Sequence, residues 1–423
     1  MKSRLFALLL LAASLAFGPA ALAFDPNDYV PARHKDPGSD DFGWFLAPTP
    51  VNLEGVGSAV PVFGLLANGY QGADLIGVTT LPGGDFAVNV AVLDEFPLLW
   101  GFQFTGGIFS IDAAYNLYNH GIDSNPDDYV VPYFHQAADF WDLRYVGWEQ
   151  RIEIFYRDMK GSGEQIKVLD AKGNTISDQK SKNSFTGQQY GFQFDLTDDR
   201  VDPRRGTRFG QKSKPMESDT AFTSDLLVTD QEINFYIPMD HVDTLVVNAF
   251  RSRSSITRAG VTDEASARAA LSQGCVKGAA GYAACKAAED KIVNDALAYN
   301  RYGATSLGGS DRLRGYDMGR FTAGNADFYG VEYRWNFADE AKPVNWYVIG
   351  GVNTLVQLAI FAETGSVADK TADLSNQYKS DVGVGIRAII SGFVYRLDLA
   401  MGDEGLGVTM FIDYPMQLLP VME

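Results

Sequence analysis

The sequence predicts an all-β fold: a transmembrane antiparallel β-barrel of about 16 strands, with a loop inserted into its lumen and a short helical insertion in a surface loop. Three observations lead to this prediction. The chain begins with an apolar segment typical of exported proteins, and it alternates apolar and polar residues in many separate stretches. A polar, glycine-rich loop directly precedes the most regular of these stretches.

The predicted secretory signal peptide occupies residues 1–23. Lys2 and Arg4 give it a basic start, the stretch LFALLLLAASLAF is apolar, and Ala21-Leu22-Ala23 is a small-x-small cleavage site. A membrane anchor is the alternative, but the apolar stretch is short for a span and no stop-transfer pattern follows it. The chain is therefore expected to be exported.

Alternation with a period of two recurs along the rest of the chain. It is clearest over residues 327–337, DFYGVEYRWNF. Because successive side chains of a strand point to opposite faces, each such segment has one apolar face and one charged or glycine-rich face. The predicted lumen-facing polar positions include Glu332, Asp381, Gly383, Gly385, Arg387, Arg396 and Asp398.

A water-soluble β-sandwich alternates in the same way, so the two architectures have to be distinguished. Aromatic residues lie near the ends of the apolar faces, as at Tyr329, Trp335 and Tyr395. The opposite faces combine full charges with glycine, which suits a water-filled or loop-filled lumen. In a bilayer, strands must close into a barrel with no free edge. We expect an irregular arm over 24–43 and the barrel over 44–423.

Composition narrows the function classes. Without Lys2 and Arg4, the chain has 33 basic and 53 acidic residues, a formal charge of −20, which disfavours nucleic-acid binding. No cofactor and no metal site is predicted, because no loop has a suitable ligand spacing. His120 and His135 are candidates for catalysis, but no serine or carboxylate is spaced to form a triad with them. We therefore expect no enzymatic activity and assign no catalytic residue.

One segment breaks the alternation. Residues 262–300 are alanine-rich with helical spacing, and they contain both cysteines of the chain, Cys275 and Cys285. In an exported protein, one local disulfide is expected between them. The insertion is either a solvated decoration of a long loop or a cap or partner-docking element over the barrel mouth, held by Cys275 and Cys285.

The loop over 307–321, LGGSDRLRGYDMGRF, has neither a helical nor a strand period and precedes the strand that contains Glu332. Arg314 can fold into a polar lumen and form a charge-assisted pair with that glutamate. The loop is interpreted either as a plug that rigidifies the barrel or as a latch that sets its state. Both interpretations place Arg314 against Glu332.

The two residues after the arginine complete the predicted lumen latch. Gly315 lets the backbone turn where a side chain would clash. Tyr316 is expected to pack on inward glycines such as Gly383 and Gly385.

Four stretches, in order along residues 190 to 413, resemble the bacterial surface antigen superfamily of outer-membrane assembly barrels, which includes BamA, TamA and the two-partner secretion transporters. The triplet Arg314-Gly315-Tyr316 is similar to the arginine-glycine-aromatic triplet in the sixth surface loop of that family. GVEYRWNF resembles the acidic strand after this loop, and SDVGVGIRAIISGFVYRLDLAMG resembles the penultimate hairpin. FDLTDDRVDPRRGTRF resembles the Asp-rich turn of the family, with Asp199, Arg200, Pro203 and Gly206 in place.

The sequence also departs from the family pattern. A second acidic partner is expected on the strand after Glu332, but WYVIGGVNTLVQL has Ile349 and Gly350 at that place, and Asn353 is the nearest polar candidate. Family members carry periplasmic POTRA domains before the barrel, and this chain is expected to lack them. Pro415 interrupts the last strand, so either the seam between the last and first strands is short or the terminus is frayed.

The resemblance implies an integral barrel in the outer membrane of a Gram-negative bacterium. It would assist the insertion or translocation of proteins, with the Arg-Gly-Tyr loop latched in its lumen. The alternatives are a plugged or specialised transport pore, and a surface antigen or scaffold without insertase activity. The expected partners are outer-membrane lipids and outer-membrane protein clients, and the barrel is expected to be monomeric.

Overall fold

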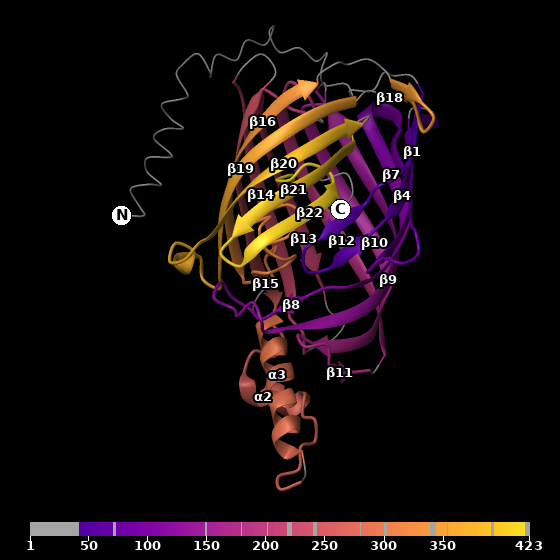
Figure 1. Ribbon diagram of the computed structural model, residues 1–423. Coiled ribbons are helices and arrows are strands. Elements are labelled where there is room, and N and C mark those ends of the chain that lie inside the picture. The colour runs from indigo at the N-terminus through magenta and orange to yellow at the C-terminus, as the bar shows by residue number, and fades with distance from the viewer. Residues whose placement is uncertain are drawn as a thin grey trace.

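The computed structural model describes residues 42–70, 73–148, 150–178, 180–200, 202–217, 222–239, 243–279, 281–299, 303–338, 344–352, 354–390 and 393–418. Over these residues one large antiparallel sheet is rolled into a barrel, and two helices project from one end (Figure 1). The predicted signal peptide and residues 24–41 of the predicted arm lie outside the described residues. Gly43, the last residue assigned to that arm, already opens the first strand.

Sixteen strands of six or more residues build the wall of the barrel in the described part of the chain. They are β1 (Gly43–Pro48), β4 (Pro61–Tyr70), β5 (Ala73–Thr80), β6 (Ala87–Pro97), β7 (Phe102–Ala114), β9 (Tyr129–Gly147), β10 (Ile152–Asp170), β12 (Ser181–Thr197), β13 (Gly206–Met216), β14 (Asp225–Pro238), β15 (Thr244–Arg258), β16 (Asn325–Ala338), β19 (Thr354–Ala368), β20 (Lys379–Ile390), β21 (Phe393–Gly402) and β22 (Gly405–Ile412). The shorter strands are β2 (Val51–Leu53), β3 (Gly57–Ala59), β8 (Leu117–Tyr118), β11 (Thr175–Ser177), β17 (Val344–Trp346) and β18 (Ile349–Val352). The predicted fold class is confirmed.

Long strands that follow one another in the chain pair antiparallel, so the wall is a series of hairpins. The short strands do not interrupt this order. β7 pairs directly with β9, β10 with β12, and β16 with β19.

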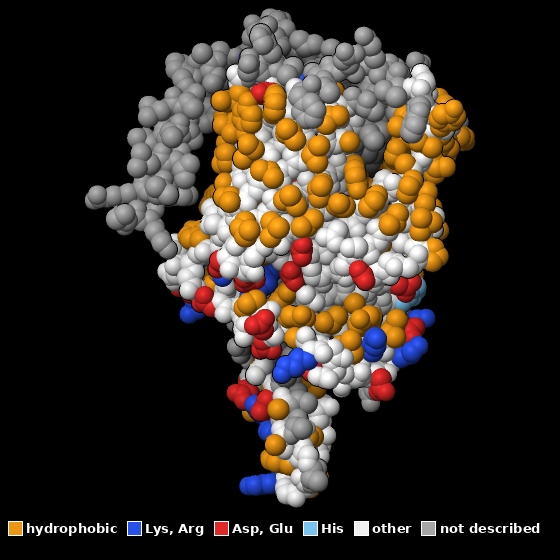
Figure 2. All heavy atoms as spheres, in the orientation of Figure 1, with side chains coloured by type: hydrophobic (Ala, Val, Ile, Leu, Met, Phe, Trp, Pro, Cys, Tyr) orange, Lys and Arg blue, Asp and Glu red, His pale blue; other side chains and the backbone are white. Residues whose placement is uncertain are grey.

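Side chains alternate between the lumen and the outer surface as the sequence pattern predicts. On β16, Glu332 and Arg334 are buried, whereas Val331 and Trp335 are exposed. Large apolar side chains form a band around the upper part of the visible face, and most of the charged side chains on this face lie below it (Figure 2). An outward apolar band over an inward polar face is the pattern of a transmembrane barrel. Exposed apolar side chains on the wall include Leu66, Leu75, Ile108, Leu143, Ile154, Phe194, Ile360, Val382, Val384, Ile386 and Leu399.

Three strongly exposed aromatic side chains stand on turns at one end of the barrel. Trp100 follows β6, Trp148 follows β9, and Tyr347 follows β17. In an antiparallel series these turns share one end, opposite the helices (Figure 1). Aromatic residues at this level match the girdle that flanks the apolar band of membrane barrels.

Among the described strands, the backbone ladder does not close at one place, the seam between β22 and the first wall strand, β1. β22 meets β2 through one residue pair, Asn52 with Met410, while β1 pairs with β4 on one side and with β18 on the other. Side chains bridge the gap, among them Tyr395, whose hydroxyl donates to the Pro50 carbonyl at 2.6 Å. The Asn52 amide donates to the carbonyl of Val408, and the Val408 N–H donates to the Glu54 carboxylate 2.6 Å away. The seam is short, one of the two outcomes that the sequence left open.

The chain after β22 turns into the lumen. Tyr414 and Met416 are buried, and the Met416 N–H donates to the Asp311 carbonyl at 3.3 Å. Positive φ angles of 107° at Asp413 and 61° at Met416 reverse the backbone on both sides of Pro415. Within the described residues, this packed segment is not a frayed terminus.

The predicted insertion forms two helices, α2 (Glu264–Ala270) and α3 (Tyr282–Tyr299), as expected from its helical spacing. Asp263 caps α2 by accepting a 2.8 Å hydrogen bond from the Ser266 N–H. In the part of the chain that the structure describes, no helix is both long and apolar enough to cross a membrane.

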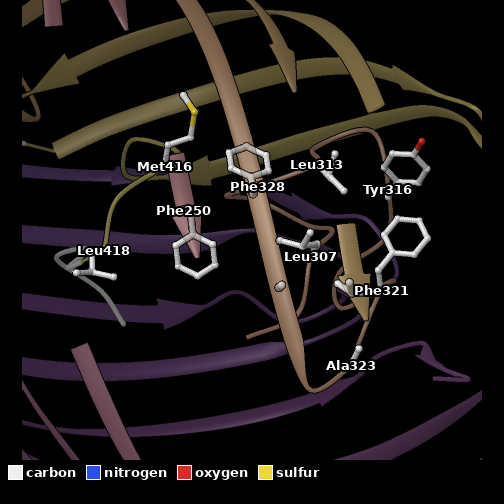
Figure 3. Close-up of a cluster of buried hydrophobic side chains, with 11 residues drawn as sticks. Phe250, Leu307, Leu313, Tyr316, Phe321, Ala323, Phe328, Met416 and Leu418 are labelled. Carbon is white, nitrogen blue, oxygen red and sulfur yellow. The ribbon is translucent and has the colours of Figure 1, made fainter. Parts of the chain in front are cut away.

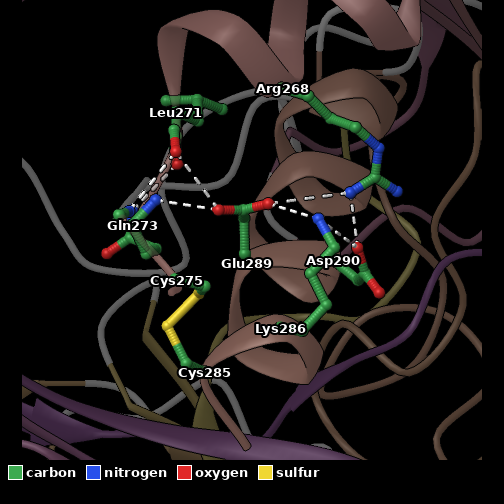
Figure 4. The surroundings of a disulfide bond; sticks show 10 residues. Arg268, Leu271, Gln273, Cys275, Cys285, Lys286, Glu289 and Asp290 are labelled. Atoms are coloured by element: carbon green, nitrogen blue, oxygen red, sulfur yellow. Dashed lines mark hydrogen bonds and ion pairs between the residues drawn. A yellow bond between two sulfur atoms is a disulfide. The ribbon is translucent and has the colours of Figure 1, made fainter. Parts of the chain in front are cut away.

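A disulfide joins Cys275, in the segment between the helices, to Cys285 on α3 (Figure 4). This confirms the predicted pairing. Beside it, the Glu289 carboxylate accepts hydrogen bonds from the Gln273 N–H at 3.0 Å and from the Lys286 ammonium (Figure 4). The disulfide and Glu289 therefore fix the same connecting segment against α3.

Reducing the disulfide should leave the thermal stability of the barrel unchanged. The bond joins residues only ten positions apart, and the helices have a small core of their own around Ala267 and Val293. The measurement is the temperature at which the folded barrel loses its compact electrophoretic mobility, with and without reductant. Amide hydrogen exchange over 264–299 should accelerate on reduction. A lower barrel transition would show that the insertion supports the wall.

Candidate functional site

The loop that contains Arg314 folds back on itself inside the barrel. Leu307 and Phe321 form an antiparallel bridge with two backbone hydrogen bonds of 2.9 Å. Within this closed loop, Gly309 donates to the Tyr316 carbonyl at 3.0 Å. Gly308 and Gly309 have φ angles of 102° and 113°, a region that favours glycine, so the consecutive glycines permit the tight turn.

A hydrophobic cluster fixes the loop against the inner wall (Figure 3). Leu307, Leu313 and Phe321 are fully buried, and they pack with Phe328 of β16 and Phe250 of β15. Burying each such side chain contributes roughly 1.5–3 kcal/mol relative to leaving it exposed. The loop is thus held by apolar contacts as well as by charge.

Arg314 is bound by three carboxylates from three strands. Its Nη2 lies 3.1 Å from Glu332 on β16, its Nε lies 2.9 Å from Glu363 on β19, and its Nη1 lies 3.0 Å from Asp398 on β21. All four side chains have no solvent exposure. The guanidinium carbon also stands 3.4 Å from the ring centroid of Phe361, in cation–π geometry. The structure thus brings together the predicted partners Arg314 and Glu332.

Further arginines share these carboxylates and extend the buried network. Arg387 binds Glu332 with two hydrogen bonds of 2.5 and 2.7 Å, and Arg334 binds the same carboxylate at 2.8 Å. Arg396 binds Asp398. Together with Arg314 this makes four arginines around the carboxylates of Glu332, Glu363 and Asp398. Such a network is stable only when each charge finds a partner.

Gly315 and Tyr316 extend the contact to β20 and to the turn between β21 and β22. The Gly315 N–H donates to Asp381 at 2.7 Å, and a Cβ on Gly315 would lie 2.9 Å from that side chain. The Tyr316 hydroxyl donates to Asp403 at 2.8 Å. Burial would raise the pKa of the Asp403 carboxyl, but hydrogen bonds from Lys379 and Tyr316 outweigh it and lower this pKa.

The predicted packing of Tyr316 on Gly383 and Gly385 is wrong. Tyr316 packs on Gly402, where a Cβ would lie 2.7 Å from the Tyr316 ring. A Cβ at Gly383 would instead meet the Phe361 ring, and one at Gly385 would meet the Asp398 carboxylate. These glycines therefore make room for the side chains that bind Arg314.

Sequence reasoning missed Glu363, the second acidic partner. Asn353 lies outside the described residues, and Ile349 and Gly350 belong to β18, a short hairpin strand rather than the neighbour of β16. The neighbour is β19, whose Glu363 pairs with Gly330 of β16. Glu363 also accepts the Arg314 backbone N–H at 2.9 Å. Following the apolar–polar alternation of the sequence for ten residues beyond Asn353 would have identified Glu363 as a lumen-facing acidic residue.

A second loop, between β7 and β9 and including β8, contacts the Arg-Gly-Tyr loop at the helical end of the barrel. Asn116 donates to Asp317 at 2.8 Å. Arg320 binds Ser124 at 2.6 Å and Glu404 at 2.8 and 2.9 Å. These contacts carried no sequence signal, because the partners lie between 84 and 201 positions apart.

The Asp-rich turn lies at the opposite end of the lumen. Asp202 accepts hydrogen bonds from the Tyr414 hydroxyl at 2.8 Å and from Arg204 at 3.1 Å. On β13, Arg208 binds Asp195 at 2.7 Å. The turn thus holds the C-terminal segment inside the barrel.

The two histidines considered for catalysis each contact one carboxylate. His120 lies 2.7 Å from Asp369, and His135 lies 2.7 Å from Asp112. Among the described residues, no group of three or more His, Cys, Asp or Glu side chains is arranged to hold a metal ion.

No family model and no curated protein matches the chain. Among solved structures, it is similar to BamA from Haemophilus ducreyi lacking POTRA domains 1–3, at 10% identity and a TM-score of 0.47 over 89% of this chain and 69% of that one. It is also similar to CdiB from Acinetobacter baumannii, at 10% identity and a TM-score of 0.47; the match covers 88% of this chain but only 60% of CdiB. The β domain of the Bordetella autotransporter BrkA follows at 8% identity and a TM-score of 0.21, over 88% of this chain and 96% of that one.

Arg314→Ala should lower the free energy of unfolding by about 3–5 kcal/mol, because it leaves buried carboxylates without a partner. The measurement is urea-induced unfolding in lipid vesicles. Arg258→Ala is the control, since it breaks a 2.6 Å pair with Asp225 at a 40% exposed side chain and should cost less than about 1 kcal/mol. Equal losses in the two variants would contradict the role of Arg314.

Arg314→Ala and Glu363→Ala should be strongly non-additive, because each removes the same buried pair. Unfolding of the single and double variants gives the coupling energy, expected at about 1–3 kcal/mol. The same cycle with Glu332→Ala should also give a coupling energy, but a smaller one. In the Arg314→Ala variant, Glu332 keeps two partners, Arg334 and Arg387. Additive losses in the Glu363 cycle would disprove a direct interaction.

Proposed function

We propose that this protein is an outer-membrane barrel that assists the insertion or translocation of other proteins, and that the Arg-Gly-Tyr loop is a latch in its lumen. The observation that carries the proposal is the burial of Arg314 among three carboxylates on β16, β19 and β21. A plug needs only to fill space. A loop whose charge is matched on three separate strands couples its own position to the arrangement of those strands.

The latch lies close to the seam. Asp398 is on β21, which pairs with the seam strand β22. The loop backbone also touches β22 directly, since a Cβ on Gly407 would lie 2.8 Å from the Arg314 carbonyl oxygen. Engagement of the loop would hold β21 and β22 against the wall. Its release would leave the seam edge of β22 with the Asn52–Met410 pair and the hydrogen bonds from Asn52 and to Glu54.

The proposed location is the outer membrane of a Gram-negative bacterium. The outward apolar band and the turn aromatics fit a bilayer. Membrane barrels have short periplasmic turns and longer extracellular loops, so the helical end would face outward. The proposed partners are outer-membrane lipids and outer-membrane protein clients, and the proposed role is non-enzymatic and requires no cofactor.

A plugged transport pore is the second candidate. It is favoured by the way the loop and the C-terminal segment both fill the lumen, as shown by the burial of Leu313, Tyr316 and Met416. In this case release of the loop would open a conducting path rather than the seam. A third possibility is a surface scaffold that binds a partner through α2 and α3. This function would require neither opening of a conducting path nor opening of the seam.

The decisive experiment measures how fast a denatured client barrel folds into liposomes with and without this protein. Wild type should accelerate folding about tenfold or more, equivalent to at least about 1.4 kcal/mol of the barrier. Arg314→Ala should lose most of this acceleration, while Arg258→Ala should keep it. Each variant is compared after its folded state has been verified by heat-dependent electrophoretic mobility.

The alternative outcome is equally informative. If wild type does not accelerate client folding, the insertase proposal fails. Single-channel conductance then tests the pore: Arg314→Ala should conduct where wild type stays closed. Unchanged conductance in the variant would leave the scaffold as the function to pursue.

A further inference from the structure

A cavity of about 810 Å³ occupies the part of the lumen that the latch does not fill. It is lined by strands β5, β6 and β7 and by residues of the C-terminal segment 413–418. Arg314 does not line it. The side of this cavity formed by β5, β6 and β7 is mostly apolar, whereas its other side carries charged residues such as Arg157, Arg208 and Glu232.

Two apolar rows run across neighbouring strands on the lumen side. The first consists of the cross-strand partners Phe63, Val78, Val90 and Phe109. The second consists of Leu65, Ile76 and Val92. Ile76, Val78, Val90, Val92 and Phe109 line the cavity, and Val90, Val92 and Phe109 are only partly buried, so the cavity itself is bounded by aliphatic and aromatic surface.

The outer face of the same strands is apolar too. Leu66, Leu75 and Ile108 are exposed in the outward band. These strands are therefore apolar on both faces, unlike β16 and β20, whose lumen faces carry Glu332 and Arg387. The row residues on β4 and β5 are covered by other side chains of the protein. Val90, Val92 and Phe109 are only partly buried, so a water-filled cavity would leave them solvated, at a cost of about 25 cal/mol for each Å². An apolar occupant would remove that cost.

A charged layer borders the apolar rows. On β6, Asp94 follows Val92 by two positions, and it accepts a 2.6 Å hydrogen bond from Thr105 on β7. Beyond it, Arg144 lies 3.1 Å from Glu153. All four polar residues line the cavity. The cavity is thus amphipathic. One part is lined by the apolar rows, and its polar end contains both positive and negative side chains.

The cavity also reaches the seam. Val51 and Leu53 of β2 line it, as do Phe411 and Ile412 of β22. These are the strands that meet through the single pair of Asn52 and Met410. The weakest line of the wall therefore separates the apolar cavity from the place where the bilayer lies.

We propose that this cavity binds the aliphatic chain of a lipid whose polar headgroup rests on the charged layer and whose chain enters from the bilayer at the seam. Its volume lies within the roughly 300–1,000 Å³ of pockets that hold small ligands, and an apolar side combined with polar groups that fix a ligand's orientation is typical of them. The proposal does not depend on insertase activity or on the latch.

Photo-crosslinking in vesicles tests the proposal. The full chain is reconstituted with a trace of phosphatidylcholine that carries a diazirine at the end of one acyl chain, and a parallel sample contains a free fatty acid with the same chain. After irradiation, adducts are mapped to residues. Adducts are expected on the lumen-facing Val90 and Phe109, in addition to the lipid-facing Ile108. Labelling by the phospholipid, by the fatty acid or by both identifies the source of the chain.

A matched pair of variants on one strand controls for lipid at the outer surface. Val90→Trp fills the cavity and should reduce lumen adducts by about tenfold, because the indole takes the volume that the chain occupies. Ala91→Trp places the same side chain on the outward face and should leave the lumen adducts unchanged. Adducts confined to outward residues in wild type would overturn the proposal, whether or not Val90→Trp folds. Equal lumen labelling in the two folded variants would also overturn it.

Discussion

A guanidinium that has no access to water needs its charge and its donors met inside the protein. Arg314 meets this requirement with Glu332, Glu363 and Asp398, and most of the C-terminal half of the barrel is arranged around that contact. A shift of β16, β19 or β21 by one residue would turn its carboxylate to the lipid face. The loop position and the strand register therefore depend on each other. This mutual dependence is what makes the loop more than a filler of the lumen.

The lumen is divided between two kinds of chemistry. Around the loop, arginines and carboxylates alternate across β16 to β21, and Gly383 and Gly385 leave room for them. Across β4 to β7, valine, phenylalanine and isoleucine take the equivalent positions. The first region suits a charged loop that can bind the strands of the barrel wall or dissociate from them. The second region, across β4 to β7, suits an apolar ligand.

Both regions reach the seam between β22 and β2. The loop backbone lies against β22 at Gly407, and the cavity is bordered by Phe411 of β22 and Val51 of β2. The C-terminal segment, anchored through Tyr414 to the Asp-rich turn, lies between them. A protein that opens at this line would expose the latch on one side and the lipid cavity on the other. Movement of the seam would thus couple the two proposed activities.

The sequence by itself determined the alternating strands, the helical insertion, the disulfide and the pairing of Arg314 with Glu332. These depend on local spacing or on residues 18 positions apart. Only the tertiary structure decided that Glu363 and Asp398 complete the arginine site, that Tyr316 packs on Gly402, and that the C-terminal segment turns inward. The physical reason is register. Alternation states which face a side chain occupies, but not its level along the barrel, and contacts across a lumen depend on that level.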